Sequence, residues 1–290
     1  MKRTLSLLMA VLMLTAVVLT GCSSGGTTSG AASSDASSAS SEAESESSAA
    51  EENDLLAQIK EKGTITVAME GTWAPWTYHD AEDNLVGYDV EVAQNIAEKL
   101  GVEVNFVEGE WDGLLAGLDD GRYDIMVNGV GVTEERAEKY NFSTPYAYNR
   151  TAVIVRGDYK EINSMEDLEG KTTANTISST YAQLAEQYGA EVTGVDDLNQ
   201  TFELLNSGRI DATLNAEVTF YDYTKEHPDA NVKIAVLTQD ANEVAIPLRK
   251  GEESATLREA INAAIDELRA SGQLKELSEK YFGTDISTNE

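Results

Sequence analysis

Cysteine and histidine are both scarce in this chain. Cysteine occurs once, at Cys22, so no internal disulfide can form, and two histidines, His79 and His227, are too few for a His/Cys metal site. The sequence also has no Ser-His-Asp order typical of hydrolases and no phosphate-binding glycine loop. It therefore predicts a protein with no metal, no cofactor and no enzymatic activity.

Basic residues are few as well. The 290-residue chain has 21 Lys and Arg against 51 Asp and Glu, a formal net charge of −30 at pH 7. A surface this negative repels nucleic acid and anionic lipid headgroups, which excludes both as partners. It also disfavours a strongly anionic ligand.

The chain has only one long apolar run, which extends from Leu5 to Leu19. This run is shorter than the roughly 20 residues that a retained transmembrane helix needs, and it follows Lys2 and Arg3. With the L-T-G-C tetrapeptide that ends at Cys22, residues 1–21 have the pattern of a secretory signal with a lipobox. We expect Cys22 to carry a lipid and to anchor the protein to the outer face of the cell membrane.

Residues 22–53 are almost entirely Ser, Ala, Gly, Thr and Glu. Such a segment cannot bury apolar surface, so we expect a disordered tether with an average span of roughly 30 Å. A tether of this length fits a Gram-positive cell wall better than a narrow periplasm.

One pattern occurs twice in the remaining chain. L-D-D-G-R-Y-D-I-M-V-N fills Leu118–Asn128, and L-N-S-G-R-I-D-A-T-L-N fills Leu205–Asn215. In both copies a leucine-bearing helix ends at glycine, and a short apolar strand follows and stops at Asn. A shorter echo, Gly63–Ala68 and Gly170–Asn175, predicts a strand at the start of each half. The chain therefore contains two similar halves.

Strands and helices alternate in the first half, where the apolar spacing predicts a helix over 89–100. Alternation indicates an α/β fold with mostly parallel sheets, whose ligands bind beyond the carboxyl ends of the strands. Asn128 and Asn215 should then both point at a ligand cleft. Two further helices are expected at Ser254–Ala270 and Gln273–Tyr281; the first has a core-facing stripe at Leu257, Ala260, Ile261, Ala264, Ile265 and Leu268.

The most informative run is N-G-V-G-V-T-E-E-R, followed four residues later by N-F-S-T-P-Y. It places Arg136 just after Thr133, a hydroxyl residue that can cap a helix. A fork of N–H donors beside a helix N-terminus is a receptor for carboxylate.

The run resembles the signature of family 3 solute-binding proteins, the extracytoplasmic amino-acid receptors of ABC importers, and the resemblance extends from about Asp54 to Gly283. It implies a two-lobed periplasmic-binding-protein fold of type II with a two-strand hinge. Lobe 1 would span 54–148 and lobe 2 would span 151–236, and residues 240–285 would return to lobe 1. The implied partners are a small amino acid, a permease and its ATPase, and the receptor itself would be a monomer.

Carried over from the family, Arg136 binds the ligand carboxylate, the backbone N–H of Gly131 points inward, and Thr133 fixes the loop. Thr176 to Thr180 falls where the family runs a loop into a helix N-terminus that closes over the same carboxylate. Trp73 and Trp111 fall where aromatic rings sandwich the ligand. Tyr181 is a further candidate wall, whereas Trp76 should pack in the core.

The ammonium site departs from the family pattern, because Gly131 replaces the usual Ser or Thr and Ala216 replaces the usual Asp. A buried ammonium still needs compensation. Glu70 is the first candidate and Glu217 the second. Neutral acceptors could come from the carbonyl of Gly129 and the side chains of Asn128 and Asn215.

The small polar residues of the predicted site suit a polar, uncharged ligand, and the runs A-N-T-I-S-S-T-Y and D-A-T-L-N-A-E-V resemble those of cystine receptors. Two alternatives stay open: an amino-acid-sensing receptor domain, and an enzyme similar to cyclohexadienyl dehydratases, for which Glu70 and Glu217 are the available acid and base. The sequence does not identify the amino acid, the permease or the affinity.

Overall fold

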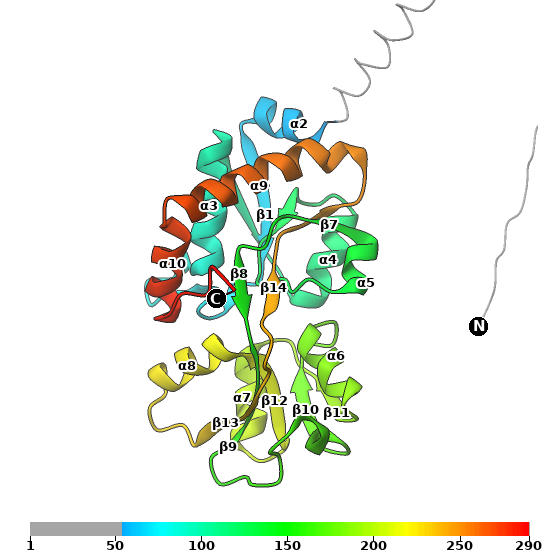
Figure 1. The fold of residues 1–290 in the computed structure, drawn as a ribbon, viewed down its shortest axis with the longest axis vertical. Coiled ribbons are helices and arrows are strands. Elements are labelled where there is room, and N and C mark those ends of the chain that lie inside the picture. Colours follow the sequence, from blue (N-terminus) through cyan, green and yellow to red (C-terminus); the bar gives the residue numbers. More distant parts are fainter. Residues whose placement is uncertain (1–53, 290) are drawn as a thin grey trace, which may run out of the picture. The chain divides into compact units, whose positions relative to one another are not determined.

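The computed structural model describes residues 54–289 (Figure 1). The predicted signal, the lipidation site at Cys22 and the tether lie outside the described residues. The two larger sheets divide the folded chain into two lobes. Residues 54–149 and 242–289 form what we call the first lobe, and residues 151–237 form the second lobe. Among residues 54–289, no helix combines the length and apolar character needed to cross a bilayer.

The first lobe is built on a three-stranded parallel sheet in the order β5-β1-β6. A small antiparallel sheet, β2-β3-β4, joins β1 to α3, and β7 and β8 pair with β15 and β14 from the returning chain. The elements in chain order are α2 (Leu55–Lys62), β1 (Thr64–Met69), β2 (Thr72–Trp73), β3 (Thr77–His79), β4 (Leu85–Val86), α3 (Tyr88–Leu100), β5 (Glu103–Glu108), α4 (Trp111–Asp119), β6 (Ile125–Met126), α5 (Glu134–Lys139), β7 (Tyr140–Phe142), β8 (Ala147–Asn149), β14 (Asn242–Val244), β15 (Pro247–Arg249), η2 (Glu252–Ser254), α9 (Ala255–Ala270) and α10 (Gln273–Phe282).

The second lobe is a five-stranded sheet in the order β11-β10-β12-β9-β13. Strands β11, β10 and β12 are parallel, whereas β9 is antiparallel to both β12 and β13. The elements are β9 (Thr151–Arg156), η1 (Met165–Leu168), β10 (Thr172–Asn175), α6 (Thr180–Gln187), β11 (Glu191–Gly194), α7 (Leu198–Asn206), β12 (Ala212–Ala216), α8 (Glu217–Glu226) and β13 (Val232–Leu237).

Strand β9 shows how the second core is arranged. Ala152 and Ile154 belong to a cluster with Phe202 and Phe220, whereas Val153 and Val155 belong to a separate cluster on the other face. Side chains alternate between faces along a strand, so a strand that is apolar at every position is covered on both sides. The predicted α/β fold of two helix-flanked sheets is confirmed.

The predicted helices agree with the structure. Helix α3 begins one residue before the predicted helix, and the apolar positions that defined it are buried. Helix α9 buries every residue of the predicted stripe except Ala260, which is half-buried. It packs against α2, α3 and α10, and these helices cover the first core.

The structure contains the longer repeat as predicted, but the shorter echo between Gly63–Ala68 and Gly170–Asn175 is aligned one residue away from the structural match. In both copies the helix ends before a glycine with φ 69°, Gly121 or Gly208. The aspartate that follows then exchanges hydrogen bonds with a parallel strand of its lobe: Asp124 with Thr66 of β1, and Asp211 with Thr172 of β10. The sequence echo paired Thr66 with Thr173 instead. Because a shift of one residue moves a side chain to the other face of the sheet, the hydrogen bonds decide the correct register.

Two antiparallel segments connect the lobes. The first runs from β8 into β9, and the second runs from β13 into β14; β8 pairs with β14 and β9 pairs with β13. Tyr146, just before β8, is fully buried and donates a hydrogen bond to Asp89 of α3. The first segment therefore leaves a rigid part of the first lobe, with only Arg150 between its two strands.

Candidate functional site

A cavity lies between the two lobes, and its lining comes from the carboxyl ends of strands in both sheets. The space between its atoms, including the solvent at its mouth, is about 540 Å³. Glu70 follows β1, Gly129 follows β6, and Asn175 ends β10. This placement is the one expected for ligands of α/β sheets. The lining residues are Glu70, Trp73, Trp111, Gly129, Gly131, Arg136, Asn175, Thr176, Ser179, Thr180, Tyr181, Asp197, Leu198, Thr201 and Asn215.

Arg136 is the cation of this cavity. Thr133 caps α5 by accepting a hydrogen bond from the Arg136 N–H at 3.1 Å, as predicted, and so fixes the start of the helix. The guanidinium donates to the carbonyl of Gly131 at 2.9 Å and to the carbonyl of Ser178, in the second lobe, at 3.0 Å. It also lies 5.3 Å from the centre of the Trp111 ring. Both hydrogen bonds go to neutral oxygens, so neither balances its charge.

The Arg136 side chain is buried but has no acidic partner. The residue is only 6% exposed, and among residues 54–289 no carboxylate lies within ion-pair distance of its guanidinium. Burial lowers its pKa, but an arginine in a protein keeps its proton. A buried cation without a partner is costly, so this site is prepared for an anionic group.

The N-terminus of α6 lies beside the guanidinium. Ser179 caps the helix by accepting from the N–H of Ala182 at 3.1 Å, and Thr180 begins it. Gly131 is adjacent: a Cβ atom there would lie 3.5 Å from the Thr180 methyl group and 3.9 Å from Nη1 of Arg136. A helix N-terminus carries a partial positive charge, which adds to that of Arg136. Together they form a receptor for one carboxylate.

Aromatic rings form the walls of the cavity. Trp73 is stacked on Trp76 with 5.4 Å between ring centres, and Tyr181 meets Trp73 edge-on at 6.4 Å. Trp76 itself is 1% exposed and contacts Tyr88 and Phe282, so the prediction that it packs in the core is confirmed. Trp73 lies in the short strand β2, and Trp111 is the first residue of α4.

Glu70 brings a carboxyl group to the cavity. Its backbone N–H donates to Oδ1 of Asn128 at 2.7 Å, and its Oε2 accepts from Nδ2 of Asn128 at 2.7 Å. Burial raises the pKa of Glu70 to about 7, and the charges of Asp112 and Asp197 add to the rise, whereas the Asn128 hydrogen bond opposes it. Asn128 thus holds Glu70 in a fixed pose.

Three residues predicted for the ligand site do not line the cavity. Asn128 is fully buried, and both ends of its amide form hydrogen bonds with Glu70. The Thr133 hydroxyl serves as the helix cap. Glu217 lies at the start of α8 and accepts two hydrogen bonds from Arg150, at 2.9 and 3.0 Å, outside this cavity. Glu70 is therefore the better placed of the two candidates for compensating an ammonium.

The structure brings together the other predicted site residues, namely Glu70, Trp73, Trp111, Gly129, Gly131, Arg136, Thr176, Thr180 and Asn215. The lining also includes residues that the prediction of the site omitted: Asn175, Asp197, Leu198 and Thr201. The rule that located Asn215, a polar residue at the carboxyl end of a strand, also applies to Asn175 and Asp197. Applied to β10 and β11, it would have found both.

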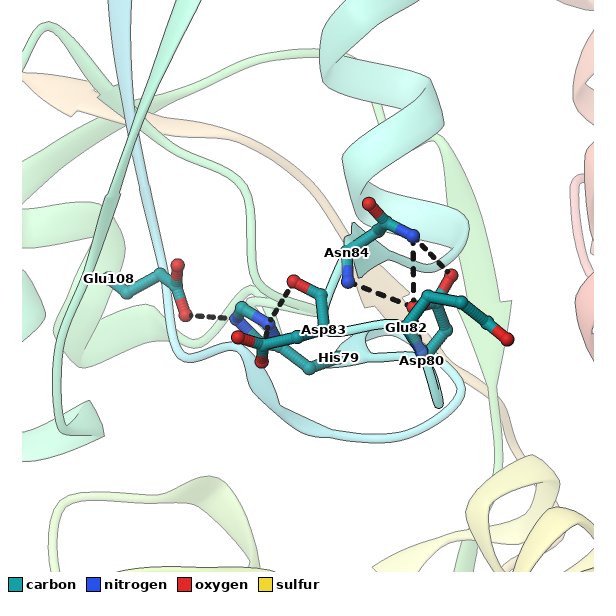
Figure 2. Close-up of polar contacts among 6 residues, drawn as sticks. All are labelled: His79, Asp80, Glu82, Asp83, Asn84 and Glu108. Atoms are coloured by element: carbon teal, nitrogen blue, oxygen red, sulfur yellow. Dashed lines mark hydrogen bonds and ion pairs between the residues drawn. The ribbon is translucent and has the colours of Figure 1, made fainter.

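The two histidines lie outside this cavity, on the wall of a second hollow between the β2-β3-β4 sheet and α8. His79 ends β3, and its ring contacts Glu108 at 2.7 Å and the carbonyl of Asp83 at 3.2 Å (Figure 2). The hydrogen bond with Glu108 raises the His79 pKa. Asp80 accepts from the backbone and side chain of Asn84 and closes the same hairpin. Through these contacts His79 connects the hairpin to β5, which is a structural role.

The residues from 54 to 289 include no group of three or more His, Cys, Asp or Glu side chains placed to hold a metal ion. Chemically, the cavity offers one cation, two carboxyl groups and aromatic walls, which suits a zwitterion with an extended side chain. Two lobes joined by two strands, with such a cavity between them, define a bilobal receptor for a small molecule.

Comparison with known proteins identifies the family. Residues 65–284 match the family model of bacterial extracellular solute-binding proteins, family 3, and the chain belongs to this family. The resemblance seen in the sequence is therefore confirmed, including the resemblance to cystine-binding members. The L-cystine-binding protein TcyA of Bacillus subtilis is 41% identical over 239 residues, which are 82% of this chain and 88% of the relative. TcyJ of Escherichia coli K12 is 37% identical over 245 residues, or 83% and 90%.

Solved structures agree. The L-cystine solute receptor of Neisseria gonorrhoeae, in its unliganded open conformation, is 40% identical and has a TM-score of 0.56; the match covers 81% of this chain and 99% of that one. An ancestral arginine-binding protein bound to arginine is 36% identical and has a TM-score of 0.72, with 76% and 99% covered. The fold is that of the type II periplasmic binding proteins.

Proposed function

We propose that this protein is the receptor of an ABC importer and captures an amino acid in the cavity between its lobes. The observation that carries the proposal is the buried guanidinium of Arg136, which has no acidic partner among the described residues and lies beside the N-terminus of α6. An amino-acid carboxylate supplies the missing anion. The relatives, which include a probable amino-acid ABC transporter-binding protein of Haemophilus influenzae, support the same role.

The ligand pose follows from the charges. The carboxylate binds Arg136 and the N-terminus of α6, and the ammonium faces Glu70, whose ionised form it favours. Glu70 thereby replaces the acceptors that Gly131 and Ala216 do not supply. The carbonyl of Gly129 adds a neutral acceptor. Trp73 and Trp111 enclose the side chain and exclude water, which strengthens both charge pairs.

The amino acid we propose is cystine, because cystine-binding proteins are among the relatives with the highest identity. Arginine is the second candidate. It is favoured by the two carboxyl groups, Glu70 and Asp197, that line a cavity with one cation, and by solved relatives that are bound to arginine. Both ligands are amino acids with a second cationic nitrogen.

Delivery requires a location at the membrane. We propose that a lipid on Cys22 anchors the protein outside the cytoplasm and that residues 22–53 tether the folded part near the permease, as the sequence predicts. The permease would recognise the closed form. Metabolic labelling with a fatty acid tests the anchor: a Cys22→Ser variant should lose the label.

A thermal-shift screen of the purified protein tests the central proposal, with the common amino acids, cystine and several dipeptides as ligands. A ligand that binds only the folded state raises the melting temperature by mass action, so a concentration of 100 Kd adds about 2.7 kcal/mol. One strong hit, with cystine expected, supports the receptor. If no α-amino acid shifts the melting temperature, the proposal is wrong and the cavity accepts another carboxylate.

One observation favours a second candidate function. A carboxyl group with a pKa near 7 in a cavity is suited to act as a general acid or base, and Glu70 has this property. The solved relatives include an ancestral amino acid-binding protein that is described as a precursor of cyclohexadienyl dehydratase. Incubation with a cyclohexadienyl carboxylate and assay of the aromatic product tests this candidate; product formed by the wild type but not by Glu70→Gln would establish it.

A further inference from the structure

The cavity has an acidic side that a single amino-acid head group does not use. Glu70 and Asp197 both line it, from the first and second lobes respectively, and their charges interact. One α-ammonium can compensate one of these carboxylates. The other carboxylate then needs a second positive charge.

Asp197 is held in place by its role as a helix cap. Its Oδ1 accepts a hydrogen bond from the N–H of Gln200 at 2.9 Å and so caps α7. Its Oδ2 has only Gln200 Nε2 nearby, at 3.5 Å, which is the limit of a hydrogen bond. The Thr201 hydroxyl donates to the carbonyl of Asp197 at 3.2 Å and further fixes the turn. One carboxylate oxygen is therefore fixed in position and weakly engaged.

Asn175 supplies the second, independent observation. It is only 4% exposed and lines the same cavity. Its Nδ2 donates to the carbonyl of Leu214 at 2.7 Å, which fixes the orientation of the amide. Its Oδ1 is buried and has no hydrogen-bond partner among the described residues. A buried acceptor without a partner is costly, so this oxygen is prepared for a donor that arrives with the ligand.

These groups are all acceptors, and a set of acceptors with a negative charge recognises a cationic N–H donor. We propose that Asp197 and Asn175 form a second cation subsite, on the second lobe, that takes the cationic nitrogen at the distal end of the ligand. The inference rests on the proposed function and adds a specificity to it. The receptor selects amino acids with a second cationic nitrogen, which both the distal ammonium of cystine and the guanidinium of arginine provide.

The test compares ligand pairs that differ in this nitrogen. For cystine, the partner is the mixed disulfide of cysteine and 3-mercaptopropionate, which keeps the distal carboxylate and lacks the distal ammonium. For arginine, the partner is citrulline, in which a neutral urea replaces the guanidinium. Calorimetric titration of the purified protein should show that the cationic member of the preferred pair binds at least about tenfold tighter.

The Asp197→Asn variant removes the charge and keeps the cap, because Asn caps helices as well as Asp does. Its melting temperature without ligand should match that of the wild type. We expect the variant to bind the cationic ligand about tenfold more weakly than the wild type does. Its affinity for the neutral partner should be unchanged. Asp196→Asn is the matched control, since Asp196 is exposed, adjacent and outside the cavity; it should keep the wild-type ratio.

The outcomes separate the two proposals. The cation subsite is overturned if the wild type binds the cationic ligand and its neutral partner with equal affinity. It is also overturned if Asp197→Asn keeps the wild-type ratio of these two affinities. Either result leaves the receptor proposal intact. If the wild type binds none of the four ligands but another amino acid raises its melting temperature, the subsite is overturned and the receptor stands. If no amino acid does so, both proposals fail. Should Asp197→Asn not fold, Asp197→Ser keeps a capping oxygen and gives the same comparison.

Discussion

At the scale of single residues, Arg136 makes the sharpest prediction. Arg136→Ala should abolish measurable binding of any amino acid, because the carboxylate would be buried without a partner, at a cost of about 3 kcal/mol or more. Stability without ligand should change little, since the guanidinium is buried and none of the ion pairs within residues 54–289 includes it. Calorimetry and thermal unfolding measure the two effects.

Arg150→Ala is the control for the loss of a positive charge. Arg150 is paired with Glu217 away from the cavity and is partly exposed, so its loss should leave affinity within about twofold. Binding of wild-type strength in Arg136→Ala would show that the carboxylate lies elsewhere.

Glu70 makes a prediction about pH. Its pKa is raised from an ordinary 4.5 to about 7, so between these values the folded state binds a proton that the unfolded state has released. The contribution of Glu70 to the stability of the ligand-free protein is thus fully present below about pH 4.5 and is lost as pH rises through about 7, by an amount of order 3 kcal/mol. Asp89, also raised to about 7 by burial, acts in the same direction. Denaturant unfolding should show a smaller loss over this range in Glu70→Gln.

Ligand binding should have the opposite pH dependence. An ammonium favours the ionised form of Glu70, so affinity should increase as pH rises from 5 to 7, and binding near pH 6 should release a proton. Titration in two buffers with different ionisation enthalpies measures the proton. If Glu70→Gln releases as many protons as the wild type, Glu70 does not face the ammonium.

At the scale of the elements, the turn after β6 positions the aromatic wall. Gly129 has φ 55°, in the left-handed region, and a Cβ there would lie 2.5 Å from a ring carbon of Trp73. Gly129→Ala should displace Trp73, destabilise the fold by about 1–3 kcal/mol and weaken ligand binding at least tenfold. Tryptophan fluorescence and calorimetry would follow both changes.

Gly101→Ala separates backbone strain from the steric contact. Gly101 has φ 74°, but no atom lies within 4 Å of the added Cβ. The Gly101→Ala variant should lose about 1 kcal/mol of stability and bind the ligand as tightly as the wild type does. Equal affinities in the two variants would mean that Trp73 does not contact the ligand.

The elements also show what the sequence could predict. Helix α3, helix α9 and the Thr133 cap depend on residues a few positions apart, so local spacing was enough to find them. Asn128 and Asn215 occupy matching places in the repeat but have different roles, because the partner of Asn128 is Glu70, 58 residues away in the sequence. Asp197 follows β11, so the rule for strand ends could have found it, but only the fold shows that its charge acts on Glu70.

At the scale of the whole molecule, the two lobes lie in contact across the cavity. Asp112, in the first turn of α4, accepts hydrogen bonds from the N–H and the hydroxyl of Ser178 in the second lobe, at 3.1 and 2.6 Å. Arg136 also reaches across to the Ser178 carbonyl. These observations indicate a closed form.

We therefore expect ligand to shift an equilibrium between open and closed forms, and the Asp112 contact to favour the closed one. Fluorescent labels at Glu82 and Asp229, exposed residues of the first and second lobes, should approach each other when ligand is added. Asp112→Ala removes both hydrogen bonds to Ser178, worth about 1 kcal/mol, so ligand should dissociate about fivefold faster. Asp120→Ala, an exposed residue next to the same helix, should change nothing. A dissociation rate equal to that of the wild type in Asp112→Ala would mean that closure depends on the ligand and Arg136 alone.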